Sequence, residues 1–256
     1  MEIARVGLVN LGLQPVPVAE VRDDHVAAIV RVRGAPETLA RRMLARPVIC
    51  AAAMVAAGDA DVMVAGIETP TRRVIEAAQL AIGLEGGLAM PSSFFLMRFP
   101  DGREFIFADC AVNVAPDAEG LAAIATASAR SARSLLGEAR VALLSYSTGT
   151  SGAGEAVARV HAAAEQTGFE GPVQGDAALN TAIARAKGAG QGDANVLIFP
   201  SLEAGNIAYK LCQELAGAQA VGPFLQGFAR PVCDLSRGAT PDDIVASTAV
   251  ALALGR

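Results

Sequence analysis

The segment Arg140–Gly154 reads RVALLSYSTGTSGAG, an apolar run followed by a loop rich in hydroxyl groups and glycine. The run is short and partly β-branched, which predicts a buried strand, and the Ala-rich stretch from Gly154 to Thr167 predicts an amphipathic helix. Strand-like runs of the same kind occur at Asp61–Ala65 (DVMVA) and Asn195–Pro200 (NVLIFP). This alternation predicts an α/β fold, in which βαβ units form a mostly parallel sheet with helices on both faces.

The rest of the chain adds further elements to this pattern. An antiparallel hairpin is expected around Pro100-Asp101-Gly102, because strand-like runs lie on both sides of this turn sequence. One long helix is expected from Pro36 to Gly58, and a strand over Val16–Val21. Further helices are expected at about residues 117–136, 177–187 and 205–216.

The composition of the 256-residue chain is that of a globular protein, with 52% hydrophobic and 18% charged residues. The net charge is −5 and the basic residues are scattered, which argues against nucleic acid as a partner. The most apolar run, Pro47–Ala57, is too short to cross a bilayer, so no membrane partner is expected. The four cysteines lie far apart without a CxxC pair, which favours free thiols in the cytoplasm. No metal site is expected, because neither histidine lies near another motif.

Residues Pro231–Gly238 read PVCDLSRG and bring a hydroxyl, a guanidinium and a carboxylate to the start of a predicted C-terminal helix. Free N–H groups and the helix dipole attract anions at such a position, and Arg237 adds a positive charge. A nearby carboxylate such as Asp243 can take a proton from a nucleophile. Thr240-Pro241-Asp242-Asp243 equally fits a helix cap, in which Asp243 only satisfies backbone groups.

Three other loops follow predicted strands, at the edge where open α/β sheets bind ligands. The loop Ser145–Gly154 either binds a phosphate, because glycine lets the backbone approach an anion, or is an ordinary capped turn. The loop Gly66–Arg73 contains two threonines and two arginines. These side chains either bind an anion or belong to a solvent-exposed first turn of a helix. The loop Phe199–Asn206 either binds a ligand or caps the next helix through Ser201 or Asn206.

Six blocks, in this order, resemble the phosphate acetyltransferase (phosphotransacetylase) family, which includes phosphate butyryltransferases. The blocks are GDADVMVAG (Gly58–Gly66), ADCAVN (Ala108–Asn113), VALLSYSTGTSGAG (Val141–Gly154), GPVQGDAA (Gly171–Ala178), FPSLEAGNIAYK (Phe199–Lys210) and GPFLQGFARPVCDLSRGATPDDIV (Gly222–Val245). The resemblance implies reversible acyl transfer between coenzyme A and phosphate, with no metal and no tightly bound cofactor. It implies two three-layer α/β domains with a cleft, related to isocitrate and isopropylmalate dehydrogenases and usually assembled as a homodimer.

The resemblance also implies roles for particular residues. Asp243 matches the aspartate proposed to deprotonate the thiol of coenzyme A. Ser236 and Arg237 match the pair thought to position acyl phosphate and to stabilise its developing charge. The substrates, coenzyme A or acetyl-CoA and phosphate or acetyl phosphate, are expected to contact Ser145, Ser147, Thr148, Thr150, Gly152, Gly66, Thr71, Arg72, Arg73, Asn206 and Lys210.

The chain departs from the family pattern at two positions and at its start. Glu76 stands where many members have Arg, and Cys233 stands where Asn is usual. Either Arg72 and Arg73, on a similar helical face, replace the missing charge, or Glu76 repels phosphate. The first strand and helix of domain one have no counterpart here, so either the start codon is misassigned or domain one is shortened.

The same resemblance places domain one over residues 1–85 and 226–256, with the three catalytic candidates, and domain two over residues 86–225. The leading hypothesis is a phosphate acyltransferase acting on acetyl-CoA or another short acyl-CoA. The alternative is a non-catalytic regulatory module that binds acyl-CoA, or an inactive truncated homologue. The three intact catalytic candidates favour the enzyme, whereas Glu76 and the short N-terminus favour the module.

Overall fold

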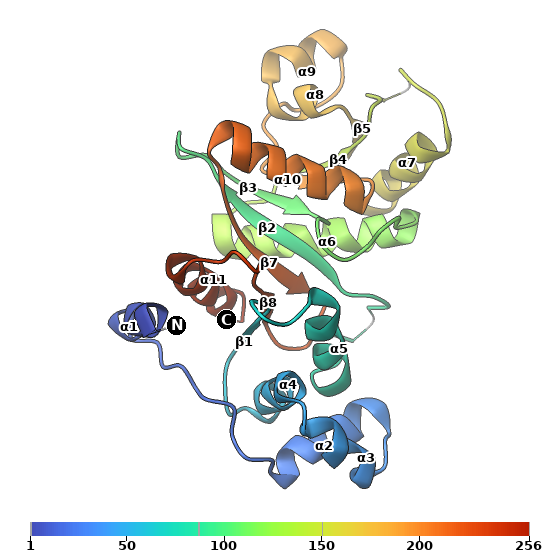
Figure 1. Ribbon diagram of the computed structural model, residues 1–256. Helices are drawn as coiled ribbons and strands as arrows, with labels where there is room; N and C mark the ends of the chain where they lie inside the picture. The colour runs from blue at the N-terminus through green and yellow to red at the C-terminus, as the bar shows by residue number, and fades with distance from the viewer. Residues whose placement is uncertain (1, 87, 150, 256) are drawn as a thin grey trace. The chain divides into compact units, whose positions relative to one another are not determined.

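The computed structural model describes residues 2–86, 88–149 and 151–255 as a mixed α/β protein (Figure 1), which confirms the predicted fold class. The chain divides into two compact units, Met1–Pro91 with Gly222–Arg256 (unit 1) and Ser92–Val221 (unit 2). The domain boundaries expected near residues 85 and 225 stay a prediction. Within the described ranges, no helix combines the length and the apolar character needed to cross a membrane.

Unit 1 is built from both ends of the chain around short strands. Its strands are β1 (Met63–Ala65), β8 (Val232–Asp234) and the end of β7 (Gln219–Gln226), which enters the unit at Gly222. β8 pairs with β1 in parallel and with β7 in antiparallel orientation. The helices of the unit are α1 (Glu2–Asn10), α2 (Asp23–Arg33), α3 (Glu37–Leu44), α4 (Pro47–Ala57), α5 (Thr71–Ala81) and α11 (Pro241–Leu254).

The core of unit 1 centres on α4, an almost entirely apolar helix that contacts α2, α3 and α5. The single long helix expected from Pro36 to Gly58 is wrong, because α3 ends at Leu44 and α4 begins at Pro47. Proline disfavours helical backbone at the residue before it, and Arg46 is extended, with φ −89° and ψ 119°. Pro47 then takes the first position of α4, where no N–H group is needed. The strand expected over residues 16–21 is also wrong, because these residues form neither strand nor helix.

Unit 2 contains a sheet with the strand order β2–β3–β6–β4–β5. β2 (Ser92–Arg98) and β3 (Glu104–Ala108) form the predicted antiparallel hairpin. β6 (Val196–Ile198), β4 (Val141–Leu144) and β5 (Glu170–Val173) continue the sheet in parallel. The helices of the unit are α6 (Ala118–Leu136), α7 (Glu155–Thr167), α8 (Gly175–Leu179), α9 (Thr181–Lys187) and α10 (Leu202–Ala216).

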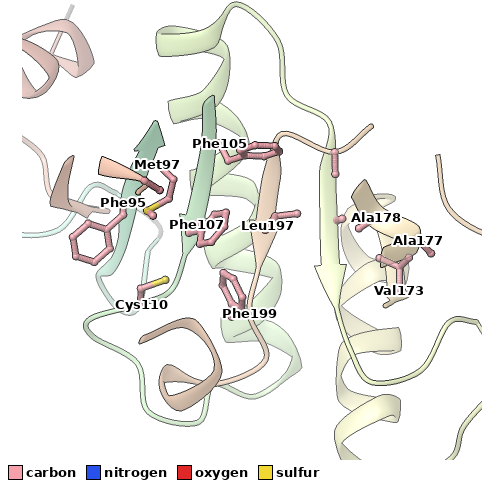
Figure 2. Packing of buried hydrophobic residues seen from close by; sticks show 13 residues of the cluster. Phe95, Met97, Phe105, Phe107, Cys110, Val173, Ala177, Ala178, Leu197 and Phe199 are labelled. Atoms are coloured by element: carbon pink, nitrogen blue, oxygen red, sulfur yellow. The ribbon is translucent and has the colours of Figure 1, made fainter. Parts of the chain in front are cut away.

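Alternate residues of β2, β3 and β6 share one face of this sheet and form an apolar cluster (Figure 2). The ring centroids of Phe107 and Phe199 are 5.2 Å apart, and Phe95 stacks on Tyr209 of α10 at 4.3 Å. Side chains of α8 and α10 complete the cluster on this face. α6 contacts the strands on the other side of the sheet from α10 (Figure 1), so helices lie on both faces, as the sequence predicts.

The helix expected over residues 177–187 is wrong as a single element, because Asn180 divides it into α8 and α9. Oδ1 of Asn180 accepts hydrogen bonds from the N–H groups of Ala182 and Ile183, at 3.0 and 3.2 Å. Asn180 therefore caps α9, which ends at Lys187.

Gly205→Ala is expected to lower the free energy of unfolding by about 1–3 kcal/mol, the usual effect of overpacking. A Cβ atom there would lie 2.5 Å from the carbonyl oxygen of Asp109 and 2.9 Å from Sγ of Cys110, so α10 would have to move. Urea denaturation measures the change. Gly175→Ala is the control, because nothing lies within 4 Å of its Cβ position. Equal destabilisation by both changes would contradict this explanation.

Candidate functional site

The ends of β1 and β8 meet at one edge of unit 1 and bring two polar side chains together. Asp234 is the last residue of β8, and Thr71 is the first residue of α5. The Oγ1 hydroxyl of Thr71 donates a hydrogen bond of 2.5 Å to Oδ2 of Asp234. This bond joins the start of α5 to the loop that carries Ser236 and Arg237.

Gly66, the residue after β1, makes this close approach possible. Its φ is +128°, a conformation that L side chains rarely adopt. A Cβ atom there would lie 2.3 Å from the carbonyl oxygen of Leu235 and 2.6 Å from Oδ1 of Asp234. The two backbones are held at this distance because the N–H of Leu235 donates to the carbonyl oxygen of Ala65 at 2.6 Å. Glycine at position 66 therefore allows the backbones after β1 and β8 to lie in contact at this edge.

Asp234 has an unusual environment for a carboxyl group. The residue is only 2% exposed, and Oδ1 has no hydrogen-bond partner among the described residues. Burial raises the pKa of Asp234 to about 6, while the hydrogen bond from Thr71 acts in the opposite direction. Asp234 is not among the site residues that the sequence predicts. The sequence feature that could have identified Asp234 is its position as the last residue of a strand, two positions before Ser236.

Ser236 and Arg237 lie in the loop between β8 and α11, and both are exposed. Within the described part of the chain, Arg237 forms no hydrogen bond or ion pair through its side chain. An unpaired guanidinium can bind a phosphate or carboxylate through two parallel hydrogen bonds. Arg237 is therefore available to an anionic ligand.

Asp243, the third residue of α11, forms a reciprocal cap with Thr240. Its N–H donates to Oγ1 of Thr240 at 3.2 Å. Its Oδ2 accepts hydrogen bonds from the N–H and the hydroxyl of Thr240, at 2.9 and 2.8 Å. The capping interpretation of Asp243 thus describes these contacts, and its role as a base stays a prediction.

Glu76 is paired with two arginines and does not act as an isolated negative charge. Arg46 donates to both carboxylate oxygens at 3.2 and 3.3 Å, and Arg73 donates to Oε2 at 2.6 Å. These contacts lower the pKa of Glu76 to about 2, and the hydrogen bonds from Arg46 have the largest effect. Arg72 is exposed and pairs with no residue that the structure describes. α5 therefore presents Arg72, and not Arg73, as an available positive charge.

In unit 2, hydroxyl groups fold the loop that follows β4. Oγ of Ser147 accepts from the N–H of Gly152 at 2.7 Å and lies 3.1 Å from Oγ of Ser151. The N–H of Thr148 donates to Oγ of Ser151 at 3.0 Å. Ser147 and Thr148 are only 1% and 7% exposed, so these side chains are used mainly within the protein. Thr150, also predicted to bind substrate, lies outside the described residues.

The same loop is attached to β5 through its backbone. The N–H of Ser145 donates to the carbonyl oxygen of Val173, and the N–H of Gly149 to that of Pro172, both at 2.9 Å. Oγ of Ser145 also accepts from the N–H of Ser147 at 3.3 Å. Ser145 and Gly149 are therefore tied to β5 at the carboxyl edge of β4 and β5.

The remaining candidates lie on α10. Nδ2 of Asn206 donates to the carbonyl oxygen of Cys110 at 3.2 Å, which anchors the helix to the loop after β3. Nζ of Lys210 lies 5.0 Å from the ring centroid of Tyr209. The cap of α10 is Ser201 and not Asn206.

The cysteines are poor candidates for chemistry. Cys50, Cys110 and Cys233 are buried, and Cys212 is partly buried. Burial raises the pKa of each thiol above its ordinary value. Because the thiolate is the reactive form, none of these groups is poised as a nucleophile.

Comparison with known proteins agrees with the motifs of both units. A sequence model of the phosphate acetyl/butaryl transferase family matches residues 14–252. The chain is 42% identical to the phosphate acetyltransferase of Nitratidesulfovibrio vulgaris and 39% identical to that of Escherichia coli, over 96% and 93% of its length. It spans only 38% and 35% of the lengths of these relatives. The EutD phosphotransacetylase from Staphylococcus aureus has a similar fold, with a TM-score of 0.85, 36% identity, and coverage of 98% of this chain and 83% of that protein.

Asp234→Asn is expected to stabilise the protein at pH 8 by about 2–3 kcal/mol, at 1.36 kcal/mol per pKa unit. The native pKa of about 6 lies above the ordinary value of 3.8, so ionisation costs stability. The cost is absent below the lower pKa, grows as the pH rises between the two values and is complete above the higher one. Asparagine keeps an oxygen for Thr71 and does not ionise.

Urea denaturation of both proteins at pH 4 and pH 8 measures this effect. The wild-type protein should lose stability between the two pH values relative to the variant. A variant that is less stable than wild type at pH 8 would show that the Asp234 carboxylate has a stabilising partner.

Proposed function

Because the chain belongs to the phosphate acetyl/butaryl transferase family, we propose that it transfers an acetyl or another short acyl group reversibly between coenzyme A and inorganic phosphate. The observation that carries this proposal is the hydrogen bond between Thr71 and Asp234. It joins the start of α5, which carries Arg72, to the loop that carries Arg237, and neither arginine has a partner among the described residues. Two available guanidinium groups at one edge suit the phosphate group of an acyl phosphate.

In the proposed reaction, the thiolate of coenzyme A attacks the carbonyl carbon of the acyl phosphate. The C–S bond forms, negative charge builds on the carbonyl oxygen, and cleavage of the C–O bond passes this charge to the leaving phosphate. Arg237 and the hydroxyl of Ser236 stabilise the developing charge. Asp243 takes the thiol proton. Alignment of the two substrates lowers much of the remaining barrier, and no covalent enzyme intermediate is needed.

The charges of the two units favour different substrates. Unit 1 offers Arg72 and Arg237 as available arginines, which suit acyl phosphate, and Thr71 directly precedes Arg72 in α5. In unit 2, the loop Ser145–Gly154 offers hydroxyl and backbone groups, which suit the neutral amides of coenzyme A. Asn206 and Lys210 of α10 belong to the same unit and are proposed to contact coenzyme A as well. No tightly bound cofactor is proposed.

A homodimer is also part of this proposal. Ile207, Leu211 and Leu215 are 58%, 50% and 81% exposed and are spaced four residues apart on α10. This spacing places the three side chains on one face of the helix. An exposed apolar row of this kind is typical of an interface between protein chains and supports the proposed assembly.

The purified protein is expected to form acetyl-CoA from acetyl phosphate and coenzyme A, followed by thioester absorbance. Arg237→Ala and Asp243→Asn are each expected to lower kcat about 100-fold or more, because they remove charge stabilisation and the base. Asparagine keeps an oxygen for the cap with Thr240. Asp242→Asn, at the neighbouring exposed carboxylate, is the control and should retain activity.

The absence of thioester formation with acetyl, propionyl and butyryl phosphate would contradict the proposed activity. If coenzyme A still bound saturably in that case, the result would favour a non-catalytic acyl-CoA-binding module.

Arg72→Gln is expected to raise KM for acetyl phosphate about 10-fold, the effect of losing one charge-assisted hydrogen bond. Arg73→Gln should raise this KM less, because Arg73 is held by Glu76. Steady-state kinetics at fixed coenzyme A measure both values. A larger effect at Arg73 would show that the ion pair with Glu76 opens when substrate binds.

A further inference from the structure

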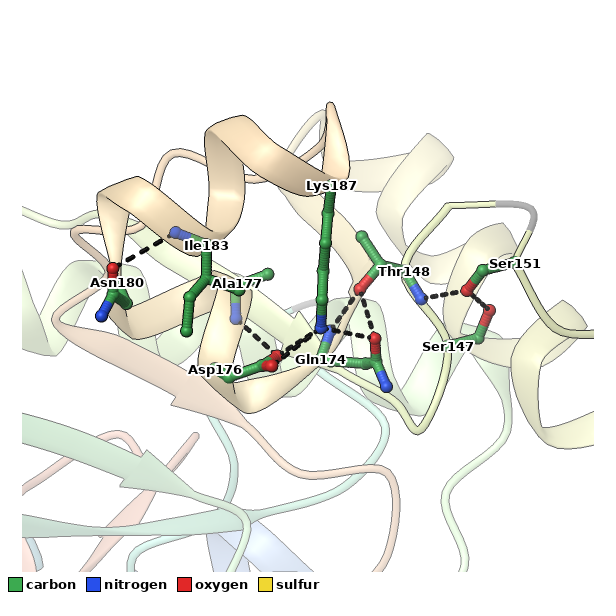
Figure 3. Close-up of polar contacts among 9 residues, drawn as sticks. All are labelled: Ser147, Thr148, Ser151, Gln174, Asp176, Ala177, Asn180, Ile183 and Lys187. Carbon is green, nitrogen blue, oxygen red and sulfur yellow. Dashed lines mark hydrogen bonds and ion pairs between the residues drawn. The ribbon is translucent and has the colours of Figure 1, made fainter.

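Unit 2 contains a polar network that fixes Gln174 beside the loop after β4 (Figure 3). Oε1 of Gln174 accepts hydrogen bonds from Nζ of Lys187 at 2.9 Å and from Oγ1 of Thr148 at 3.2 Å. The backbone N–H of Gln174 donates in turn to Oγ1 of Thr148 at 3.1 Å. Nζ of Lys187 also contacts both carboxylate oxygens of Asp176, at 2.7 and 2.8 Å. Lys187 and Thr148 thus hold the Gln174 side chain from two sides.

The network determines which way the Gln174 amide faces. An ammonium group only donates hydrogen bonds, so the amide atom 2.9 Å from Lys187 must be the oxygen. Rotating the amide by half a turn would place its NH₂ group against the ammonium group. Nε2 therefore occupies the other position, and it meets no acceptor in the part of the chain that the structure describes.

We propose that Gln174 is a further substrate-binding residue, whose Nε2 donates a hydrogen bond to an amide carbonyl oxygen of coenzyme A; this inference rests on the proposed acyl transfer. Gln174 directly follows β5 and is half-buried. It lies at the carboxyl edge of the parallel strands, where open α/β sheets bind ligands. Thr148 ties it to the loop that is proposed to contact coenzyme A.

The local charge favours a neutral acceptor over a phosphate group. Asp176 pairs with Lys187, so the two side chains add no net charge beside Gln174. The other contacts nearby, those of Thr148 with Oγ of Ser151 and with the N–H of Gln174, involve only uncharged hydroxyl and backbone groups. The pantetheine arm of coenzyme A carries neutral amide carbonyls, which match a fixed neutral donor, whereas a phosphate group is better matched by the arginines of unit 1.

Lys187 acts on the substrate only through Gln174, so it is a positioning residue. Without its ammonium group, Oε1 keeps the hydrogen bond from Thr148 alone. The amide then rotates more freely, and the donor spends less time in the binding orientation. Lys187→Met should therefore weaken coenzyme A binding, but by a smaller factor than a change that removes the donor.

Gln174→Glu separates the binding role from a structural one. Glutamate keeps an oxygen for Lys187 and Thr148 and replaces only the NH₂ group. The expected result is a rise of about 10-fold in KM for coenzyme A, as for a hydrogen bond lost with its partner left unpaired. KM for acetyl phosphate and kcat should change by less than about twofold. The melting temperature should not fall, because the new carboxylate pairs with Lys187.

The double variant Gln174→Glu/Asp176→Asn controls for the added charge. It keeps the net charge of the wild-type protein but still lacks the Nε2 donor, so KM for coenzyme A should rise as in the single variant. A wild-type KM for coenzyme A in the double variant would overturn the proposal, because repulsion alone would then explain any effect of the single variant. Thioester formation by the wild-type protein tests the proposed acyl transfer independently of these variants.

Discussion

The contact between the backbones that follow β1 and β8 is the constraint on which the candidate site of unit 1 depends. The N–H of Leu235 bonds to the carbonyl oxygen of Ala65, and the space beside Gly66 is too small for any side chain. α5 and the loop with Arg237 both start from this point. A larger residue at position 66 would separate the strand ends and would move α5, with Arg72, away from the loop with Arg237. The arrangement of catalytic candidates therefore depends on a residue that has no side chain.

Ion pairing then decides which charged side chains stay available at each site. Glu76 holds Arg73, which leaves Arg72 as the cation at the start of α5. In unit 2, Asp176 holds Lys187, which leaves a neutral amide as the group presented beside the loop after β4. The chemistry that each unit offers is thus set by the partners of its basic residues and not by how many basic residues it contains. This division accounts for the different substrates proposed for the two units.

The sequence predicts the features of this protein that depend on neighbouring residues. The hairpin at Pro100–Gly102 and the cap formed by Thr240 and Asp243 are both local patterns, and both are found. The helix breaks at Pro47 and Asn180 were missed, because each of these residues is also compatible with an adjoining helix as its first or capping position. The bond between Thr71 and Asp234 could not be predicted, because it joins residues 163 positions apart. The same holds for the orientation of the Gln174 amide, which tertiary contacts determine.

The discontinuous sequence of unit 1 has a consequence for the order of folding during synthesis. Unit 2 is one continuous segment and is complete before β8 and α11 have been translated. Until then, β1 has no strand neighbour within the described ranges, because β8 is the strand that pairs with it. Its free N–H and carbonyl groups are a template for wrong pairing in the nascent chain. The C-terminal segment therefore supplies the strand that pairs with β1, and it also carries the catalytic candidates. A chain interrupted before β8 would leave the ribosome with β1 unpaired.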